Sequence, residues 1–277
     1  MSPSVRICYN FIMINFLHTY TPDPVLISIG PVNIFWYSFL IITAVILALV
    51  VVSQLGKKYQ IKTDQIIDIG FYTIIFGILG ARLFYVLLEI DYYFFHPLDI
   101  FKVWQGGLAI HGAIIAGIIV VYIYAKKNKQ SFWLWLDISA PAVALGQAIG
   151  RWGNYFNQEL YGKPTELAWG ISIALKNRMV LYLQYEYFHP TFLYESILDL
   201  FIFFTLIILH KRGKSKQGYI FLIYLVLYSV VRFLMEFLRI DPAVSLVGLR
   251  WAQIVSILII LISLVVIYKH KLLPVKK

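Results

Sequence analysis

Residues 132–162 read "FWLWLDISAPAVALGQAIGRWGNYFNQELYG". The first part is almost uninterrupted apolar sequence, and Arg151, two asparagines and Glu159 then follow within nine residues. An apolar run of this length indicates a membrane-spanning helix, because a bilayer span needs about 20 mostly apolar residues. The stretch therefore predicts a membrane helix that ends in a cluster of polar groups.

The composition extends this interpretation to the whole chain. Of the 277 residues 60% are hydrophobic and 14% are charged, and the mean hydropathy is +0.77, whereas a soluble domain carries about 25% charged residues. We expect a single polytopic membrane domain over residues 1–277. Cys8 is the only cysteine, which excludes an internal disulfide and a cysteine-based metal cluster. The N-terminal tail has no small-residue cleavage site of a removable signal peptide, and Met1 and Met13 are alternative starts.

Seven apolar runs are long enough to cross a bilayer. The predicted fold class is therefore an all-α integral membrane protein of about seven transmembrane helices. The expected spans are about Ile34 to Val52, Ile66 to Leu88, Leu108 to Ala125, Phe132 to Ala148, Phe192 to Leu209, Gly218 to Leu238 and Trp251 to Ile267.

The basic residues predict the orientation of these spans. Of the 24 lysines and arginines, 14 lie in "GKKYQIK", "KKNK", "HKRGKSK" and the C-terminal "YKHKLLPVKK". With seven spans these segments share one side, which the positive-inside rule makes cytoplasmic. The net charge of +10 is thus explained by topology and headgroup contact rather than by nucleic acid. We expect an extracytoplasmic N-terminus, a cytoplasmic C-terminus and an extracytoplasmic insertion over residues 149–191, between helices four and five.

Several charged residues lie inside the predicted spans, where each costs roughly 2.5–3.5 kcal/mol. In "YSVVRFLMEFLR" the spacing places Tyr228, Arg232, Glu236 and Arg239 on one helix face. One interpretation is an Arg232–Glu236 pair that fixes helix packing. The other is a cationic stripe that binds an anion, which the surplus of one arginine favours. The charged residues inside spans are Arg82, Asp137, Glu195, Asp199, Arg232 and Glu236.

His111 opens the third span within "GGLAIHGA". Glycines allow another backbone or a ligand to approach closely. The histidine has a structural interpretation, as a satisfied polar group near a helix start, and a functional one, as the side chain best suited to accept a proton near neutral pH.

The polar groups after the fourth span fit phosphate chemistry. Arg151 offers a planar pair of donors to a phosphate, and Asn154 and Asn157 can donate to phosphate or glycerol oxygens. Glu159 accepts only, so we expect it to hold an arginine or a hydroxyl. Because zinc, serine-nucleophile and P-loop motifs are all absent from the sequence, zinc proteolysis, serine hydrolysis and nucleotide use lack support. An enzyme built from these polar groups would bind an anion, assist proton transfer and take its nucleophile from a substrate.

These residues resemble the bacterial prolipoprotein diacylglyceryl transferases. The family signature, roughly G-R-x-G-N-F-x-N-x-E-x-x-G, is similar to Gly150–Gly162, with Tyr155 in place of phenylalanine. Ser38 and Ala113 stand where many members have glycine. The further matches are "WYS" with Tyr37, "LGARLFYV" with Arg82, "WQGGLAIHGA" with His111, "HPTFLYE" from His189 to Glu195, and the sixth-span residues Tyr228, Arg232, Glu236 and Arg239.

The resemblance implies transfer of the diacylglyceryl group of phosphatidylglycerol to the lipobox cysteine of a preprolipoprotein, with a thioether formed and glycerol phosphate released. It also implies that the reaction needs no metal and no cofactor. It places the enzyme in the bacterial cytoplasmic membrane, with its site on the outer side. We expect Arg151 and Arg232 to clamp the phosphate, Glu159 and Glu236 to hold the arginines, and His111 to be the base, assisted or replaced by Tyr37 or Tyr228. The further substrate-binding residues expected are Asn154, Asn157, Arg82, Arg239, His189 and Glu195.

Three other functions compete with this expectation. A lipid or ion transporter could use the arginines as an anion pathway, but would leave the signature unexplained. A structural scaffold would not need His111, Arg151 and Arg232 in the outer half of the membrane. A CDP-alcohol phosphatidyltransferase is disfavoured because its D-x-x-D-G metal motif is absent from the sequence.

Overall fold

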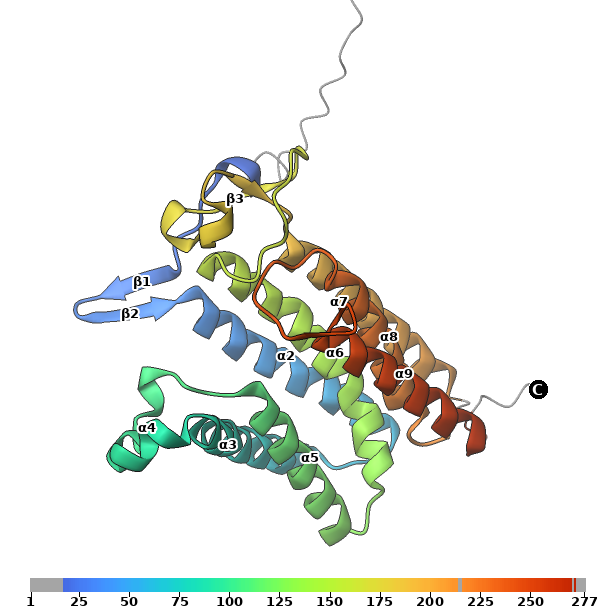
Figure 1. The fold of residues 1–277 in the computed structure, drawn as a ribbon. Helices are drawn as coiled ribbons and strands as arrows, with labels where there is room; N and C mark the ends of the chain where they lie inside the picture. The colour runs from blue at the N-terminus through green and yellow to red at the C-terminus, as the bar shows by residue number, and fades with distance from the viewer. Residues whose placement is uncertain (1–16, 214–215, 271, 273–277) are drawn as a thin grey trace, which may run out of the picture.

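The fold is mostly helical, as a computed structural model of residues 17–213, 216–270 and 272 shows (Figure 1). Cys8 and the alternative starts Met1 and Met13 lie outside the described residues. The long helices run side by side and at angles to one another, and shorter elements extend from their ends. The long helices are α2 (Trp36–Lys58), α3 (Thr63–Leu88), α5 (Ile110–Lys127), α6 (Phe132–Asn157), α7 (Thr191–Arg212), α8 (Tyr219–Met235) and α9 (Trp251–Lys269).

Short elements make up the connections between the long helices. In the described part of the chain, three antiparallel strand pairs form three separate two-stranded sheets. The prediction of an all-α chain thus omitted three small hairpin-like pairings. These elements are β1 (Val25–Ile29), β2 (Val32–Phe35), α4 (Ile90–Phe95), η1 (Pro97–Phe101), η2 (Val103–Gln105), β3 (Ile171–Ser172), η3 (Leu175–Asn177), η4 (Val180–Tyr182), β4 (Tyr187–Phe188), β5 (Ser245–Leu246) and β6 (Leu249–Arg250).

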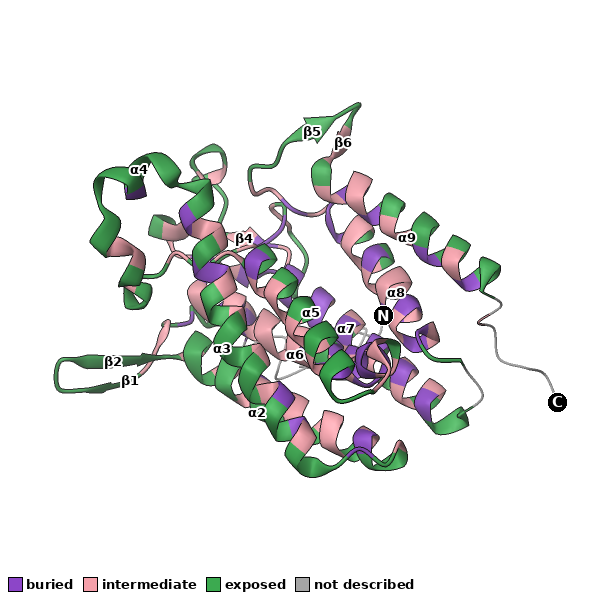
Figure 2. Cartoon of the chain, turned by 90° about the horizontal axis from the view of Figure 1, so that it is seen from below, coloured by how far each residue is buried: buried purple, intermediate pink, exposed green. Residues whose placement is uncertain are grey.

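Six described helices are long and apolar enough to cross a membrane, namely α2, α3, α5, α6, α7 and α9. The seventh apolar helix, α8, has 17 residues and is shorter than these six. The outer faces of α2, α3 and α9 carry large exposed apolar side chains such as Ile42, Leu83 and Ile262 (Figure 2). Apolar side chains exposed in such numbers indicate an apolar solvent rather than water.

Helix α6 is the centre of the bundle. It contacts α2, α5, α7 and α8, and half of its most apolar window is buried, more than in any other candidate span. Small residues such as Ala140, Ala144 and Ala148 let neighbouring helices approach its backbone closely. The helix that carries the polar signature therefore packs against four other long helices.

Two glycines hold neighbouring helices at backbone distance. A Cβ atom added to Gly112 on α5 would lie 2.2 Å from the carbonyl oxygen of Gly80 on α3. A Cβ atom on Gly153 of α6 would lie 2.4 Å from Cδ2 of Tyr37 on α2. Neither position has room for a side chain, so two of the predicted motif glycines serve close helix packing.

The predicted end of the fourth span at Ala148 is wrong by nine residues. Helix α6 continues to Asn157, and Gln158 caps it in the left-handed conformation with φ +53°. Residues 149–157 of the predicted insertion are thus helical, and only the segment after them is an excursion. Polarity did not end the helix, because Glu195 of α7 pairs with Arg151, and Glu159, just after the helix, accepts from the two asparagines.

Asp137 has a structural partner at the far end of α6. Its carboxylate accepts hydrogen bonds from the backbone N–H groups of Gly218 (2.7 Å) and Phe221 (2.8 Å). These donors belong to the first turn of α8, where backbone N–H groups have no partner within the helix. Asp137 therefore caps α8 from a neighbouring helix, and its burial follows from this role.

Candidate active site

Three motifs that are distant in sequence meet at Gly162. Its backbone N–H donates to the carbonyl of His189 (3.0 Å), and Gly162 forms an antiparallel bridge with Arg239. A Cβ atom at this position would lie 2.9 Å from Cβ of His189 and 3.1 Å from the carbonyl oxygen of Leu238. The last glycine of the signature therefore lets the signature, the His-Pro element and the end of α8 join.

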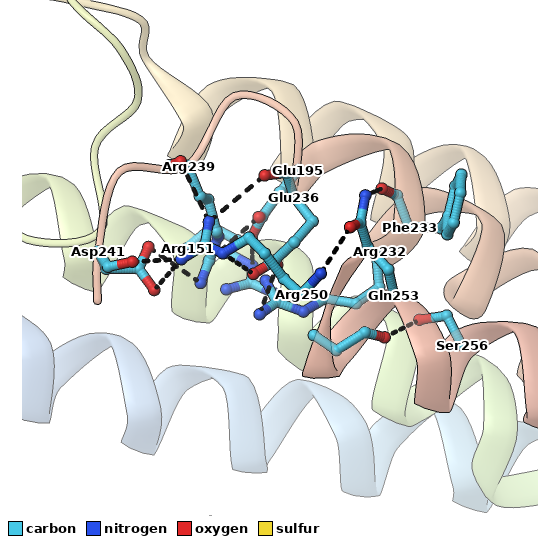
Figure 3. A network of polar contacts seen from close by, with 11 residues as sticks. Arg151, Glu195, Arg232, Phe233, Glu236, Arg239, Asp241, Arg250, Gln253 and Ser256 are labelled. Carbon is cyan, nitrogen blue, oxygen red and sulfur yellow. Dashed lines mark hydrogen bonds and ion pairs between the residues drawn. The ribbon is translucent and has the colours of Figure 1, made fainter. Parts of the chain in front are cut away.

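Arg151 and Arg239 share one carboxylate at this junction (Figure 3). Nε of Arg151 lies 2.5 Å from Oε2 of Glu195, and Nη2 of Arg239 lies 3.1 Å from Oε1 of the same residue. Glu195 is 2% exposed. A buried carboxylate requires partners of opposite charge, and the two arginines from α6 and from beyond α8 supply them.

Glu236 joins a second pair of arginines in the same network. Its Oε2 atom lies 2.8 Å from Nη2 of Arg232, and its Oε1 atom lies 3.0 Å from Nε of Arg250. Arg250 also contacts the backbone and carboxylate of Asp241. Glu236 thus contacts two arginines, and its role in holding a phosphate-binding arginine stays a prediction.

The structure corrects two parts of the predicted cationic stripe. Helix α8 ends at Met235, so Arg239 lies past the helix and does not continue the face of Tyr228 and Arg232. The positive surplus is also absent from the network, where four arginines contact four carboxylates. The predicted surplus of positive charge counted only the charged residues around one helix. The further carboxylates of the network lie on α7 and in the segment after α8.

Glu159 holds amides rather than an arginine. Its Oε1 atom accepts from Nδ2 of Asn154 (2.8 Å) and of Asn157 (3.4 Å). Among the described residues Glu159 thus contacts two amides and not the arginine or hydroxyl that the sequence led us to expect. The two signature asparagines lie one turn apart on α6, and the chain turns at Gln158 to bring the carboxylate back over them.

Gln158 explains this turn and was missed in the sequence. Its side chain is 6% exposed, donates to the carbonyl of Pro22 (2.8 Å) and accepts from the backbone N–H of Ala174 (2.8 Å). It thereby ties the segment before β1 and the segment after β3 to the end of α6. A signal was present, because a glutamine within a turn-forming signature is a candidate for backbone contacts.

The two candidate tyrosines lie on either side of α6. Tyr37 packs against Gly153, and its hydroxyl lies within electrostatic range of Glu159 and Arg151. Tyr228 stacks on Tyr224, with ring centroids 5.9 Å apart, and its hydroxyl interacts electrostatically with Arg232. Tyr37 therefore interacts with Arg151 and Tyr228 with Arg232, the two arginines that are predicted to bind the phosphate.

His111 and Arg82 lie on the α3–α5 pair instead. Within the described residues His111 forms no hydrogen bond; it is exposed, and its ring lies 6.0 Å from that of Phe84. Arg82 is buried and donates to the backbone carbonyls of Asp99, Ile100, Gly106 and Gly107. Arg82 thus holds the excursion between α3 and α5, and its expected contact with substrate stays a prediction.

His189 lies at the edge of the junction. Its Nδ1 atom lies 3.2 Å from the hydroxyl of Tyr194, which accepts a hydrogen bond from Trp169. Burial, with a smaller contribution from the Lys163 ammonium, lowers the pKa of His189 from its ordinary value. This environment favours the neutral imidazole.

A pocket of about 310 Å³ opens beside the signature. The carboxylates of Glu159 and Asp241 and the amides of Asn157 and Asn177 give it polar groups, and Asp241 connects it to the arginine network. Asp241, Asp199 and Arg250 were not among the predicted site residues. The pocket lining is Asn157, Gln158, Glu159, Leu160, Tyr161, Asn177, Met179, Ile240 and Asp241.

Comparisons with known proteins agree with the signature. The family model for prolipoprotein diacylglyceryl transferase matches residues 24–269. A protein of Nostoc sp. is 45% identical over 247 residues, which cover 87% of each chain. One of Synechocystis sp. is 46% identical over 248 residues, 88% of this chain and 87% of its own. One of Halalkalibacterium halodurans is 41% identical over 240 residues, 86% and 83% of the two chains.

All three relatives are named phosphatidylglycerol–prolipoprotein diacylglyceryl transferase. The matched region contains the arginine network, His111 and the signature. The chain therefore belongs to the prolipoprotein diacylglyceryl transferase family.

Proposed function

We propose that the protein transfers the diacylglyceryl group of phosphatidylglycerol to the lipobox cysteine thiol of preprolipoproteins. The sulfur forms a thioether with the glycerol carbon, the carbon–oxygen bond to phosphate breaks, and glycerol phosphate leaves. The names of the relatives support this reaction. The observation that carries it is the buried arginine network at the signature, because the leaving group is an anion.

Arg151 is suited to meet this anion. Its Nε atom contacts Glu195, whereas Nη1 and Nη2 form no hydrogen bond within the described residues and are not fully enclosed. A guanidinium held on one edge and open on the other can bind a phosphate with two parallel hydrogen bonds. Cations fixed where charge develops lower the barrier, because they need no reorganisation during the reaction.

Arg232 is the second cation of the proposed clamp. Glu236 fixes it through one nitrogen, and its side chain keeps 23% exposure, the largest of the four arginines in the network. Arg239 and Arg250 are occupied with Glu195, Glu236 and the loop backbone. We therefore assign Arg239, Glu195 and Glu236 the task of holding the clamp in place.

We propose that the glycerol headgroup occupies the pocket beside the signature. Asn154, Asn157 and Glu159 form one hydrogen-bonded set, of which Asn157 and Glu159 line this pocket. Amides and a carboxylate can receive and donate the hydrogen bonds of two glycerol hydroxyls. We propose that this set orients the headgroup while the arginines hold its phosphate, with His189 supporting the pocket through Gly162.

The proton of the attacking thiol needs an acceptor, because the unperturbed thiol pKa is about 8.5. We propose His111 as this base, assisted or replaced by Tyr37 or Tyr228. Within the described part of the chain the exposed imidazole of His111 forms no hydrogen bond, which supports the first choice. The proximity of Tyr37 to Arg151 and Glu159 supports the second.

The proposed topology has seven spans, with α8 as the sixth. Lysines follow α2 and α5 and lie at the ends of α7 and α9. Arg151 lies at the opposite ends of the helices, near the end of α6 and the start of α7. By the positive-inside rule this arrangement supports a site on the extracytoplasmic side of the bacterial cytoplasmic membrane, with the N-terminus outside.

One assay tests the function. Purified protein in phosphatidylglycerol vesicles is incubated with a lipobox peptide, and the peptide mass is measured. We expect the diacylglyceryl mass on the peptide's cysteine and equimolar glycerol phosphate. A peptide with serine in place of that cysteine is the control. Movement of lipid or ions without covalent product would instead support a transporter.

A further inference from the structure

Asp199 is a buried carboxylate beside the clamp to which the proposed mechanism gives no task. It lies on α7 four residues after Glu195 and is 1% exposed. Neither carboxylate oxygen accepts a hydrogen bond from the described residues. Buried polar groups are nearly always hydrogen-bonded, and an exception in a native structure requires an explanation.

Arg151 is the one cation of the described chain within 4 Å of Asp199. Its Nε atom lies 3.9 Å from Oδ2 of Asp199 and 2.5 Å from Oε2 of Glu195. Residues four apart on a helix share a face, so α7 presents both carboxylates to the same edge of the guanidinium. The Nη1 and Nη2 end is left for another partner.

The other neighbours of Asp199 do not supply it with a hydrogen bond. Tyr224 on α8 lies within electrostatic range of Asp199, but its hydroxyl donates to Gln147 on α6 (3.1 Å). Glu195 on its own helix repels it. The contact that accounts for an acid at this position is therefore the one with Arg151.

Glu195 alone cannot fix the position of Arg151, because it also holds Arg239 through its second oxygen. We propose that Asp199 is a positioning residue for Arg151, an inference that rests on the proposed function. With Glu195 it holds the Nε edge of the guanidinium from one side, so that the Nη fork points at the phosphate of the donor lipid. Asp199 also supplies the fourth carboxylate for the four arginines of the network.

The test compares Asp199→Asn and Asp199→Glu with the wild type in the vesicle assay. For Asp199→Asn we expect kcat to fall at least tenfold, with KM for phosphatidylglycerol within about twofold, because a displaced catalytic group costs rate more than ground-state binding. Asp199→Glu should recover kcat to within about threefold, since one further methylene spans the gap to Arg151. Asp199→Ser serves as a second uncharged variant if Asp199→Asn does not insert.

Asp137→Asn is the matched control, because it removes the charge of another buried aspartate that caps α8 far from the arginines. It should lower the thermal midpoint and leave the kcat of the inserted protein unchanged. Combining Asp199→Asn with Arg151→Lys should add no loss to that of Arg151→Lys alone, because both act through one side chain.

Three results would overturn the proposal: a kcat for the uncharged variants within twofold of wild type, an additive loss in the double variant, or an Asp199→Glu variant as slow as Asp199→Asn. Absence of transfer by the wild type would refute the proposed function instead. The wild-type reaction therefore distinguishes failure of the Asp199 proposal from failure of the proposed function.

Discussion

Glu195 receives Arg151 at 2.5 Å, so the signature on α6 and the His-Pro element at the start of α7 share one buried ion pair. Removing one partner of a buried pair typically costs about 3–5 kcal/mol, because the other charge remains without compensation. The Arg151–Glu195 pair thus affects both the stability of the protein and the position of the arginine proposed to bind the phosphate.

Arg151→Lys is expected to abolish most transfer while the protein still inserts. Lysine keeps the charge that Glu195 and Asp199 require, but it lacks the planar fork that can hold a phosphate with two bonds. The measurement is lipobox-peptide labelling, normalised to inserted protein. Labelling near the wild-type rate would contradict the clamp.

Gly162→Ala is expected to destabilise the junction of the three motifs. The new methyl group would meet His189, Thr191 and the backbone of Leu238 at about 3 Å, and overpacking of this kind typically costs about 1–3 kcal/mol. The measurement is the thermal midpoint in detergent. Gly150→Ala in the same signature is the matched control, because its Cβ would enter open space. Equal midpoints for both variants would contradict the assigned role of Gly162.

The sequence predicts the helices well because their apolar runs are long, and it brings Arg151, Glu195 and Arg239 together only through the family resemblance. The contact itself depends on α6 and α7 being neighbours, which no spacing within either helix contains. The continuation of α6 to Asn157 was missed for the same reason, since its polar groups find partners on another element.

Arg250 shows a second limit of what can be predicted from the sequence. It is the last residue of β6 and the N-cap of α9, and it contacts Glu236 and Asp241 because β5 and β6 turn the chain back towards α8. The glycine at position 248 could indicate a turn from the local sequence. The local sequence does not indicate that Arg250, next to this turn, contacts Glu236. Side chains that act through distant partners are the part of the site that sequence periodicity does not predict.

His189 is expected to make the stability of the protein sensitive to mildly acidic pH. Its pKa is lowered in the folded state, so below about pH 6.5 the unfolded chain binds a proton that the folded chain does not. Stability is therefore retained above this pH and lost as the pH falls towards the folded pKa. The measurement is the thermal midpoint between pH 8 and 5.5.

His189→Gln is the comparison for this pH effect. At pH 8, where histidine is neutral in both states, the two proteins differ only in their contacts. Between pH 7 and 5.5 the thermal midpoint of the variant should fall by less than that of the wild type. Parallel curves would show that other groups cause the acid sensitivity.

His111→Gln is expected to change the dependence of rate on pH as well as the rate itself. A general base contributes typically 10²–10⁴-fold, so transfer at pH 7 should fall by at least about 100-fold. Without a base only the thiolate already present in solution reacts. Residual transfer should then rise about tenfold per pH unit and level off near the thiol pKa of about 8.5.

The shape of this profile separates a base from a residue that only positions substrate. A loss that is equal at every pH would assign His111 a positioning role and move the proton acceptor elsewhere. Tyr37→Phe and Tyr228→Phe then decide between the remaining groups, because each removes one hydroxyl and keeps its ring. The variant whose residual rate follows thiol ionisation identifies the side chain that takes the proton.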